Sequence, residues 1–214
     1  MKGRQGRLAR LLPVLRRGAL ARWVSWNPRE RSDPFRTLVS CILSTRTQDK
    51  TTDAASARLF RLARTPRALT ALPEKRLVRA IFPVGFYWQK ARALRKTARL
   101  IAERNHGCVP RSLEGLLELP GVGRKVANLV LGRAFGIPAI CVDTHVHRIS
   151  NRLGLVRTRT PEETERALAR VLPRKLWTEW NGLLVNWGQT VCRPVGPKCG
   201  TCGLRSDCAR IGVE

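Results

Sequence analysis

Acidic residues are scarce in this chain of 214 residues: 15 Asp and Glu stand against 41 Lys and Arg, which gives a formal charge of +26. A solvated surface is stable with both signs mixed, so an excess of this size indicates a polyanionic partner such as nucleic acid. The alternative is compositional drift, because a GC-rich genome favours Arg. Drift selects Arg over Lys but does not explain why acids are rare, so we favour a nucleic-acid partner.

Long apolar runs are also missing. No stretch reaches the roughly 20 apolar residues that a membrane span requires, so we expect no membrane partner. Residues 1–28 contain no acid and loosely resemble a mitochondrial transit peptide, but Ser is rare there. Their apolar residues fall at helical spacing: Leu8, Leu11, Leu12 and Leu15. We interpret the segment as a folded amphipathic helix and expect a monomeric protein of the bacterial or archaeal cytoplasm, associated with the nucleoid.

Patterns typical of β-strands are absent too, since no segment alternates apolar and polar residues convincingly. Helix starts, by contrast, recur along the chain. Asp33-Pro34, Thr65-Pro66 and Thr160-Pro161 each place a capping side chain before a proline at the first helical position. Breaks between helical stripes fall at residues 83–85, 105–107, 120–123 and 136–138. We therefore predict an all-α protein.

The clearest motif is the string L-P-G-V-G-R-K-V-A at residues 119–127. Ser112 can cap a short helix before this string, and a second helix follows it. Gly121 and Gly123 let the turn take positive φ and bring bare backbone close to a ligand. The unpaired N–H groups at the start of the second helix then suit a phosphate. A plain tight turn is the alternative, but in a chain of charge +26 the string predicts DNA binding.

Two residues near this motif have the chemistry of a reactive pair. Lys125 lies in the first turn of the second helix, beside the positive end of the helix dipole, which favours the neutral and nucleophilic amine. A lysine that contacts phosphate is the alternative. Asp143 precedes an apolar-spaced run and can be read simply as an N-cap. Taken alone, that segment favours the cap.

The two strings L-P-G-V-G-R-K-V-A-N and A-F-G-I-P-A-I-C-V-D-T-H-V-H-R resemble the endonuclease III family, the bifunctional DNA glycosylases of the helix-hairpin-helix superfamily. The resemblance extends from about Leu11 to Cys208. It implies that Lys125 attacks C1′ of a damaged nucleotide, while Asp143 stabilises the developing positive charge and assists deprotonation of the lysine. The resulting Schiff base permits β-elimination and strand nicking. The implied partner is double-stranded DNA with damaged bases, expected to be oxidised pyrimidines, or abasic sites.

The resemblance also implies two helical domains with a DNA-binding cleft between them. We expect a six-helix domain with the hairpin at residues 27–136. Residues 1–26 and 137–214 would form the second domain, and Lys125 would face Asp143 across the cleft.

Further DNA contacts follow from the same resemblance. Phe86 aligns with a side chain that wedges into the gap left by a flipped base, where the best-known relatives carry Leu; a core aromatic after a turn is the alternative. Arg46 lies in a loop that fills the space opposite the lesion, where many relatives have Gln, so the opposite-base preference does not carry over. The remaining expected contacts are Gly121, Gly123, Arg124 and His145.

Four of the seven cysteines lie within seventeen residues and follow the pattern C-x6-C-x2-C-x5-C: Cys192, Cys199, Cys202 and Cys208. Spacing alone fits either tetrahedral zinc or a [4Fe–4S] cluster. The family resemblance implies [4Fe–4S]. The other three are expected to act as small hydrophobic residues: Cys41, Cys108 and Cys141.

Two competing functions remain open. A monofunctional adenine glycosylase of the same superfamily keeps the cluster, but it lacks lysine at the Lys125 position and has a catalytic Glu where this chain has Ser40. A non-catalytic DNA-binding protein that has kept the fold is the other. Lys125 and Ser40 count against the first, and the Lys125 and Asp143 pair argues against the second.

Overall fold

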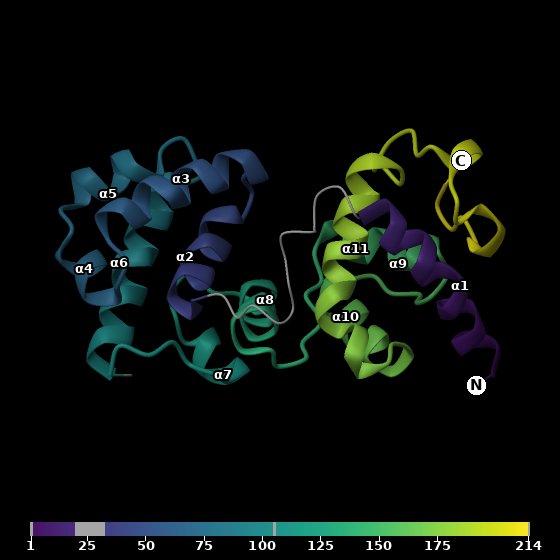
Figure 1. Ribbon diagram of the computed structural model, residues 1–214, viewed down its shortest axis with the longest axis horizontal. Coiled ribbons are helices and arrows are strands. Elements are labelled where there is room, and N and C mark those ends of the chain that lie inside the picture. The colour runs from purple at the N-terminus through teal and green to yellow at the C-terminus, as the bar shows by residue number, and fades with distance from the viewer. Residues whose placement is uncertain (1, 20–32, 105, 214) are drawn as a thin grey trace. The chain divides into compact units, whose positions relative to one another are not determined.

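The computed structural model describes residues 2–19, 33–104 and 106–213, and every regular element within these ranges is a helix (Figure 1). The prediction of an all-α protein is therefore confirmed. The α-helices are α1 (Lys2–Ala19), α2 (Pro34–Ser44), α3 (Asp49–Leu62), α4 (Pro66–Ala71), α5 (Glu74–Ile81), α6 (Tyr87–Arg104), α7 (Leu113–Leu117), α8 (Arg124–Phe135), α9 (Thr144–Arg152), α10 (Pro161–Val171) and α11 (Trp177–Thr190). Short 3-10 turns are η1 (Arg174–Leu176), η2 (Cys199–Thr201) and η3 (Arg205–Asp207).

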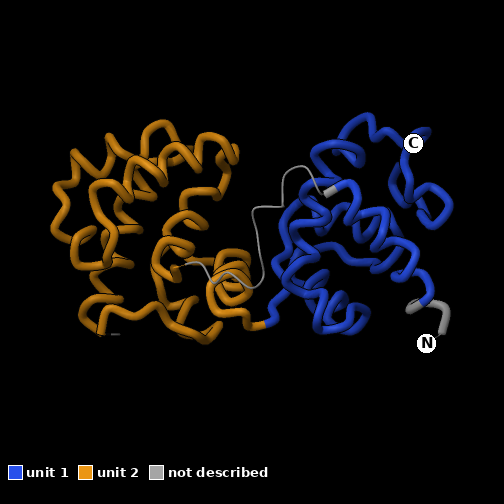
Figure 2. Tube along the Cα trace, viewed as in Figure 1, with its two compact units in different colours: residues 1–30, 138–214 blue, residues 31–137 orange. Residues whose placement is uncertain are grey.

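The chain divides into two compact units (Figure 2). One comprises residues 1–30 together with 138–214, and the other comprises residues 31–137. The first unit contains α1 and α9 to α11, and the second contains α2 to α8. Among the helices described, none is both long and apolar enough to cross a membrane.

The helix starts that were expected at Pro-led positions are all present. α2, α4 and α10 each begin at a proline that follows the capping residue. Backbone N–H groups of the first turn donate to Asp33 Oδ1, Thr65 Oγ1 and Thr160 Oγ1 at 2.7, 3.2 and 3.2 Å. Each cap of this kind stabilises its helix by about 1 kcal/mol relative to alanine, so these three boundaries are determined locally.

The unit of residues 31–137 is built around α2 and α6. α2 packs against α3, α6 and α8, while α4 and α5 pack against α6, and α7 packs against α8. Fully buried side chains of α2 and α6 fill this core: Leu38, Ile42, Leu43, Leu94 and Ile101. This packing brings the end of α2 and the turn before α8 onto the same central helix, α6.

In the other unit, α1 packs along α11 although α1 ends at Ala19 and α11 begins only at Trp177. Leu8, Leu11 and Leu15 of α1 lie in one apolar cluster with Trp180 and Leu184 of α11. The interpretation of the N-terminal segment as a folded amphipathic helix is therefore confirmed for residues 2–19, whereas residues 20–28 of that segment lie outside the described residues.

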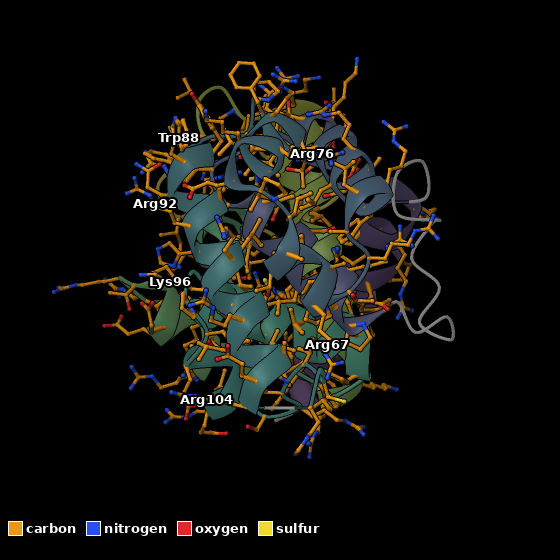
Figure 3. All side chains as sticks on the ribbon, turned by 90° about the vertical axis from the view of Figure 1, so that its left-hand side faces the viewer. Arg67, Arg76, Trp88, Arg92, Lys96 and Arg104 are labelled. Atoms are coloured by element: carbon orange, nitrogen blue, oxygen red, sulfur yellow. The ribbon has the colours of Figure 1, made fainter. Side chains whose placement is uncertain are left out.

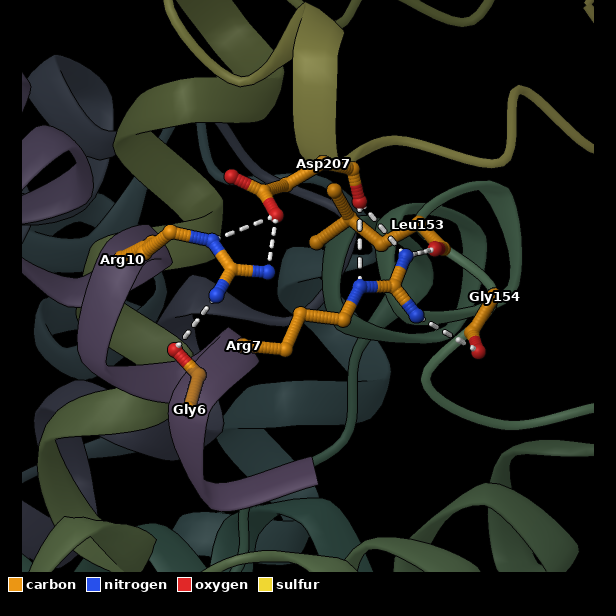
Figure 4. A network of polar contacts seen from close by, with 6 residues as sticks. All are labelled: Gly6, Arg7, Arg10, Leu153, Gly154 and Asp207. Carbon is orange, nitrogen blue, oxygen red and sulfur yellow. Dashed lines mark hydrogen bonds and ion pairs between the residues drawn. The ribbon is translucent and has the colours of Figure 1, made fainter. Parts of the chain in front are cut away.

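A side-chain network ties α1 to the C-terminal loop (Figure 4). The guanidinium group of Arg7 donates hydrogen bonds to the backbone carbonyls of Leu153, Gly154 and Asp207. Arg10 pairs with the Asp207 carboxylate at 2.7 Å, and its hydrogen bonds lower the pKa of that carboxyl group. These contacts fix the loop that carries the four clustered cysteines against the first helix.

Candidate DNA-binding and catalytic site

The predicted hairpin is present as α7, a turn and α8. Ser112 Oγ accepts a hydrogen bond from Gly115 N–H at 3.1 Å, so the expected N-cap of α7 is confirmed. Gly121 has φ +80°, and a Cβ atom there would lie 2.9 Å from Ala93 Cβ. Both the backbone conformation and the close approach to α6 therefore require glycine at this position.

Gly123 differs from the sequence expectation. Its φ is −94°, so the prediction of positive φ is correct for Gly121 and wrong for Gly123. Gly123 is instead the N-cap of α8 in an extended conformation, and a Cβ atom added there would meet nothing within 4 Å. Its lack of a side chain leaves the start of α8 open to a ligand from outside.

The hairpin turn is anchored from the inside. Thr97 Oγ1 on α6 donates to Pro120 O at 2.8 Å, and the side chains of Leu119 and Val122 are buried. Gly121, which lies between these two residues, and Gly123, which follows Val122, are exposed. The turn therefore presents its backbone to solvent while its apolar side chains hold it on the core.

The start of α8 has the properties of an anion site. No side chain caps it, so the N–H groups of its first turn point outward beside the positive end of the helix dipole. Arg124 and Lys125 are exposed in this same turn. Such a terminus binds a phosphate through backbone N–H groups, and it leaves the lysine side chain available for another role.

Asp143 is the N-cap of α9, as the sequence alone favoured. Its Oδ1 accepts a hydrogen bond from Val146 N–H at 2.8 Å. Within the described residues its second carboxylate oxygen has no hydrogen-bond partner, and the side chain is half-buried. Asp143 belongs to the unit with residues 138–214 and Lys125 to that of 31–137. That both act on one nucleotide stays a prediction.

His145 follows in the first turn of α9. Its ring is half-buried and packs so closely on α11 that a Cβ atom at Gly188 would overlap it. Arg148 approaches its Nδ1 atom at 3.2 Å. A contact between His145 and DNA stays a prediction.

The two loops expected to enter DNA lie against each other. Arg46 and Phe86 both have positive φ, 51° and 57°, and the Arg46 guanidinium carbon lies 4.4 Å from the centre of the Phe86 ring. Phe86 is 50% exposed, so the alternative of a core aromatic is wrong. Sequence reasoning missed Lys90, which is buried beneath these loops. Its position in the sequence could have indicated its burial, because Lys90 lies one helical turn before the buried Leu94 on the same face of α6.

A basic stripe runs along the outer side of α6. Trp88, Arg92, Lys96 and Arg104 are exposed and follow one another down this side of the helix (Figure 3). Neither Arg92 nor Lys96 makes an ion pair or hydrogen bond with any described residue, whereas the neighbouring Arg95 pairs with a glutamate at 3.3 Å. Arg92 and Lys96 are adjacent in sequence to Ala93 and Thr97, which contact the hairpin turn, so the stripe runs along the same helix that supports the hairpin.

The four clustered cysteines line one pocket: Cys192, Cys199, Cys202 and Cys208. Ile149, Leu153 and Trp187 complete an apolar lining. Burial raises the pKa values of the Cys202 and Cys208 thiols. No three His, Cys, Asp or Glu side chains in the described ranges converge on a single metal ion. The structure therefore brings the four cysteines to one apolar pocket, as their spacing in the sequence indicated.

One of these cysteines is joined to α9. Arg152 Nη1 lies 3.6 Å from Cys192 Sγ, and Arg148 donates to the Cys192 carbonyl at 2.9 Å. Both arginines belong to the helix that Asp143 caps. The cysteine loop is therefore a packed part of its unit and not a separate appendage.

The remaining three cysteines lie apart from the cysteine pocket. Cys41 and Cys141 are buried, as expected of small hydrophobic residues, while Cys108 is exposed. Burial raises the pKa of Cys41 to about 11, so this thiol is unreactive at neutral pH.

A helical fold with an uncapped helix start at a Gly-x-Gly hairpin defines the helix-hairpin-helix class of DNA-binding proteins. Residues 39–174 match the family model described as "HhH-GPD superfamily base excision DNA repair protein". Endonuclease III of Thermotoga maritima is 50% identical over 84% of this chain and 84% of its own length. Endonuclease III of Bacillus subtilis is 38% identical over 83% and 81%. The chain therefore belongs to the endonuclease III family within this superfamily, and the sequence resemblance is confirmed.

Solved structures give the same assignment. The structure described as "a Trapped Endonuclease III-DNA Covalent Intermediate: Estranged-Adenine Complex" matches with a TM-score of 0.82 at 34% identity, over 94% of each chain. A non-covalent endonuclease III–DNA complex matches with a TM-score of 0.83 over the same shares. A thermostable thymine-DNA glycosylase, at 24% identity and a TM-score of 0.82, shares the fold.

Proposed function

We propose that this protein is a base excision repair DNA glycosylase with AP lyase activity, which removes oxidised pyrimidines from duplex DNA. The observation that carries the proposal is Lys125, an exposed amine at the uncapped start of α8, in a chain half identical to an endonuclease III. The net charge of +26 on the chain also favours DNA as the partner.

The hairpin binds and positions the DNA backbone. The N–H groups at the start of α8 donate hydrogen bonds to a phosphate without help from a basic side chain, and Gly123 leaves room for its approach. A phosphate held there lies next to Lys125, which directly follows Arg124 in the first turn of α8. Binding at the hairpin therefore brings the sugar of a nearby nucleotide within reach of the lysine amine.

Lys125 is the proposed nucleophile. A damaged base must first leave the stack, because its glycosidic bond is inaccessible inside the duplex. The amine nitrogen then bonds to C1′ while the C1′–base bond breaks, and the base departs with the bonding electrons and a proton. Loss of a proton from the attached nitrogen and opening of the sugar ring give the Schiff base. Abstraction of a C2′ proton then expels the 3′ phosphate and nicks the strand.

Asp143 is the proposed second catalytic group. Bond breaking at C1′ develops oxocarbenium character on the sugar, which a nearby carboxylate stabilises. The same carboxylate accepts the proton that Lys125 loses. One oxygen of Asp143 caps α9 and holds the group in place, which leaves the second oxygen for this work.

The four clustered cysteines are proposed to hold a [4Fe–4S] cluster, which supplies a covalent cross-link of the C-terminal loop. The four thiols line one apolar pocket, which supports this proposal. Neither base release nor β-elimination requires an electron, so we assign the cluster a structural role.

The adenine-glycosylase alternative is not favoured by the site. At the position where that class has a catalytic Glu, this chain has Ser40, whose hydroxyl donates to Ser56 Oγ at 3.2 Å. Ser40 provides no carboxylate, whereas Lys125, which the adenine glycosylases lack, is present and exposed.

A panel of duplexes tests the proposal. Each duplex carries one oxidised pyrimidine, an abasic site or a mismatch, and base release, nicking and borohydride-trapped adducts are scored separately. We expect release, nicking and trapping on oxidised pyrimidines. Release of adenine from mismatches without nicking would establish the monofunctional alternative, and binding without any reaction would establish the non-catalytic one.

A further inference from the structure

Lys90 is a buried cation with no carboxylate partner among the residues that the structure describes. It lies in the first turn of α6 and is 6% exposed. Its ammonium group donates to three oxygens: Leu43 O at 2.7 Å, Thr45 O at 2.5 Å and Thr47 Oγ1 at 2.9 Å. These acceptors match the three donors of an ammonium group, so its hydrogen bonds are complete. Burial lowers its pKa to about 8.

Packing alone does not account for a lysine here. Burying an ammonium group among neutral oxygens costs free energy that an apolar side chain of similar length avoids. All three acceptors belong to the end of α2 and the loop that follows it, residues 43–47. Lys90 therefore specifies one conformation of that loop at a cost to the stability of the fold.

The same loop is joined to the turn that precedes α6. Gly85 N–H donates to Thr47 Oγ1 at 3.1 Å, so this hydroxyl group serves both Gly85 and Lys90. A Cβ atom at Gly85 would lie 2.5 Å from Arg46 O, which shows that the two backbones are in direct contact. Loop and turn thus form one hydrogen-bonded unit with Lys90 beneath it.

Two exposed side chains project from this unit. Arg46 and Phe86 both adopt positive φ, which is costly for residues with a side chain and persists only where neighbours enforce it. The guanidinium group of Arg46 stacks on the Phe86 ring at 4.4 Å. The pair presents two flat groups, one over the other, which can occupy the space of a separated base step.

We propose that Lys90 is a positioning residue that holds Arg46 and Phe86 together as one rigid wedge for opening the DNA stack at the lesion. This inference rests on the proposed function. Lys90 does not touch the DNA; it acts through the loop at Arg46 and the turn at Phe86. A wedge already held in shape loses little conformational entropy when it enters the duplex, so more of its binding free energy is available for unstacking.

The test compares substrates that require opening with substrates that do not. Lys90→Met removes the ammonium group and keeps the length of the side chain. Lys75→Met, at an exposed position of α5, is its control. Each variant is assayed in single turnovers on one lesion, placed either in a duplex or in an unpaired bubble. Fluorescence of 2-aminopurine beside the lesion reports unstacking independently of any cleavage.

We expect Lys90→Met to lower base release from the duplex by roughly 10- to 100-fold and to leave release from the bubble nearly unchanged. Its fluorescence rise on the duplex should be lost, while Lys75→Met should match the parent protein. Because Lys90 acts through the wedge, the double variant with Phe86→Ala should be no worse than Phe86→Ala alone. Additive losses, or equal losses on duplex and bubble, would overturn the proposal.

A milder variant covers the case in which Lys90→Met does not fold. Thr47→Val removes the hydroxyl group shared by Lys90 and Gly85, and Thr70→Val, which removes a similar hydroxyl group in α4, is its control. Thr47→Val should lower base release from the duplex but not from the bubble, by a smaller factor than Lys90→Met. Normal duplex opening by Thr47→Val would count against the proposal. If the parent protein released no base from either substrate, the proposed function would fail. The fluorescence comparison would still decide the role of Lys90.

Discussion

The Oδ1 atom of Asp143 accepts a hydrogen bond from the backbone N–H of Val146 at 2.8 Å, which makes Asp143 the N-cap of α9. A cap and a catalytic carboxylate are not exclusive roles. The cap fixes one oxygen and the direction of the side chain, while the other oxygen has no partner among the described residues. The two roles can be separated, because Asn caps a helix about as well as Asp but carries no charge.

We therefore predict that Asp143→Asn folds normally and loses catalysis. Removing a charge that stabilises a developing cation should lower base release about 10²- to 10³-fold. The melting temperature should stay near that of the parent protein, whereas Asp143→Ala should also lose about 1 kcal/mol of stability with the cap. Single-turnover base release and thermal melts measure both effects. Normal excision by Asp143→Asn would leave Asp143 as a cap alone.

Lys125→Gln should abolish the adduct that borohydride traps and leave duplex binding within a few-fold. The substitution removes the amine, but the N–H groups at the start of α8 still bind phosphate. Gel analysis of trapped adducts and a binding titration measure the two effects, with Lys75→Gln as a control. Near-normal trapping by Lys125→Gln would mean that another amine is the nucleophile.

Local signals in the sequence predicted several helix starts correctly. Asp33 and Ser112 cap their helices because the capping hydrogen bond depends only on residues two or three positions away. Gly121 was also predicted correctly, since only glycine fits its positive φ beside α6. Gly123 was not, because a glycine at a helix start is equally compatible with extended backbone.

Long-range relationships were beyond such signals. The hydrogen-bond acceptors of Lys90 lie 43 to 47 positions away in sequence, and no residue near Lys90 in the chain predicts them. The stacking of Arg46 on Phe86 likewise depends on how two loops pack. The sequence pattern of the cysteines predicted a shared metal centre, and the four thiols do line one pocket. The catalytic assignment came from family resemblance and stays a prediction.

Salt should weaken DNA binding steeply, and the stripe on α6 should account for part of the effect. With roughly five to eight phosphates neutralised, log affinity should fall with log salt at a slope near −4 to −7. Arg92→Ala combined with Lys96→Ala should make the slope shallower by about two, since each contact contributes ~0.9. The pair Arg67→Ala and Arg76→Ala, at exposed positions of α4 and α5, is the control and should leave the slope unchanged. A parent slope shallower than about −2 would mean that most of the charge is compositional drift.

The cysteine pocket should contain iron and no zinc. Thiolate-to-iron charge transfer gives a yellow-brown protein, whereas zinc is d¹⁰ and colourless. About four iron and four sulfide per chain are expected by elemental and sulfide analysis. One zinc without iron would contradict this prediction.

The structural role of the cluster makes a separate prediction for Cys202→Ala. Loss of one ligand should release the loop from Cys192 to Cys208, which Arg7 and Arg152 hold in the packed unit. The variant should therefore be poorly soluble or readily proteolysed. Whatever fraction remains folded should react with lesion DNA in proportion to its amount, because Lys125 and Asp143 lie far from these cysteines in sequence. Active-site titration by borohydride trapping measures that fraction, and soluble, folded Cys202→Ala without trapping would show that the cluster takes part in recognition or catalysis.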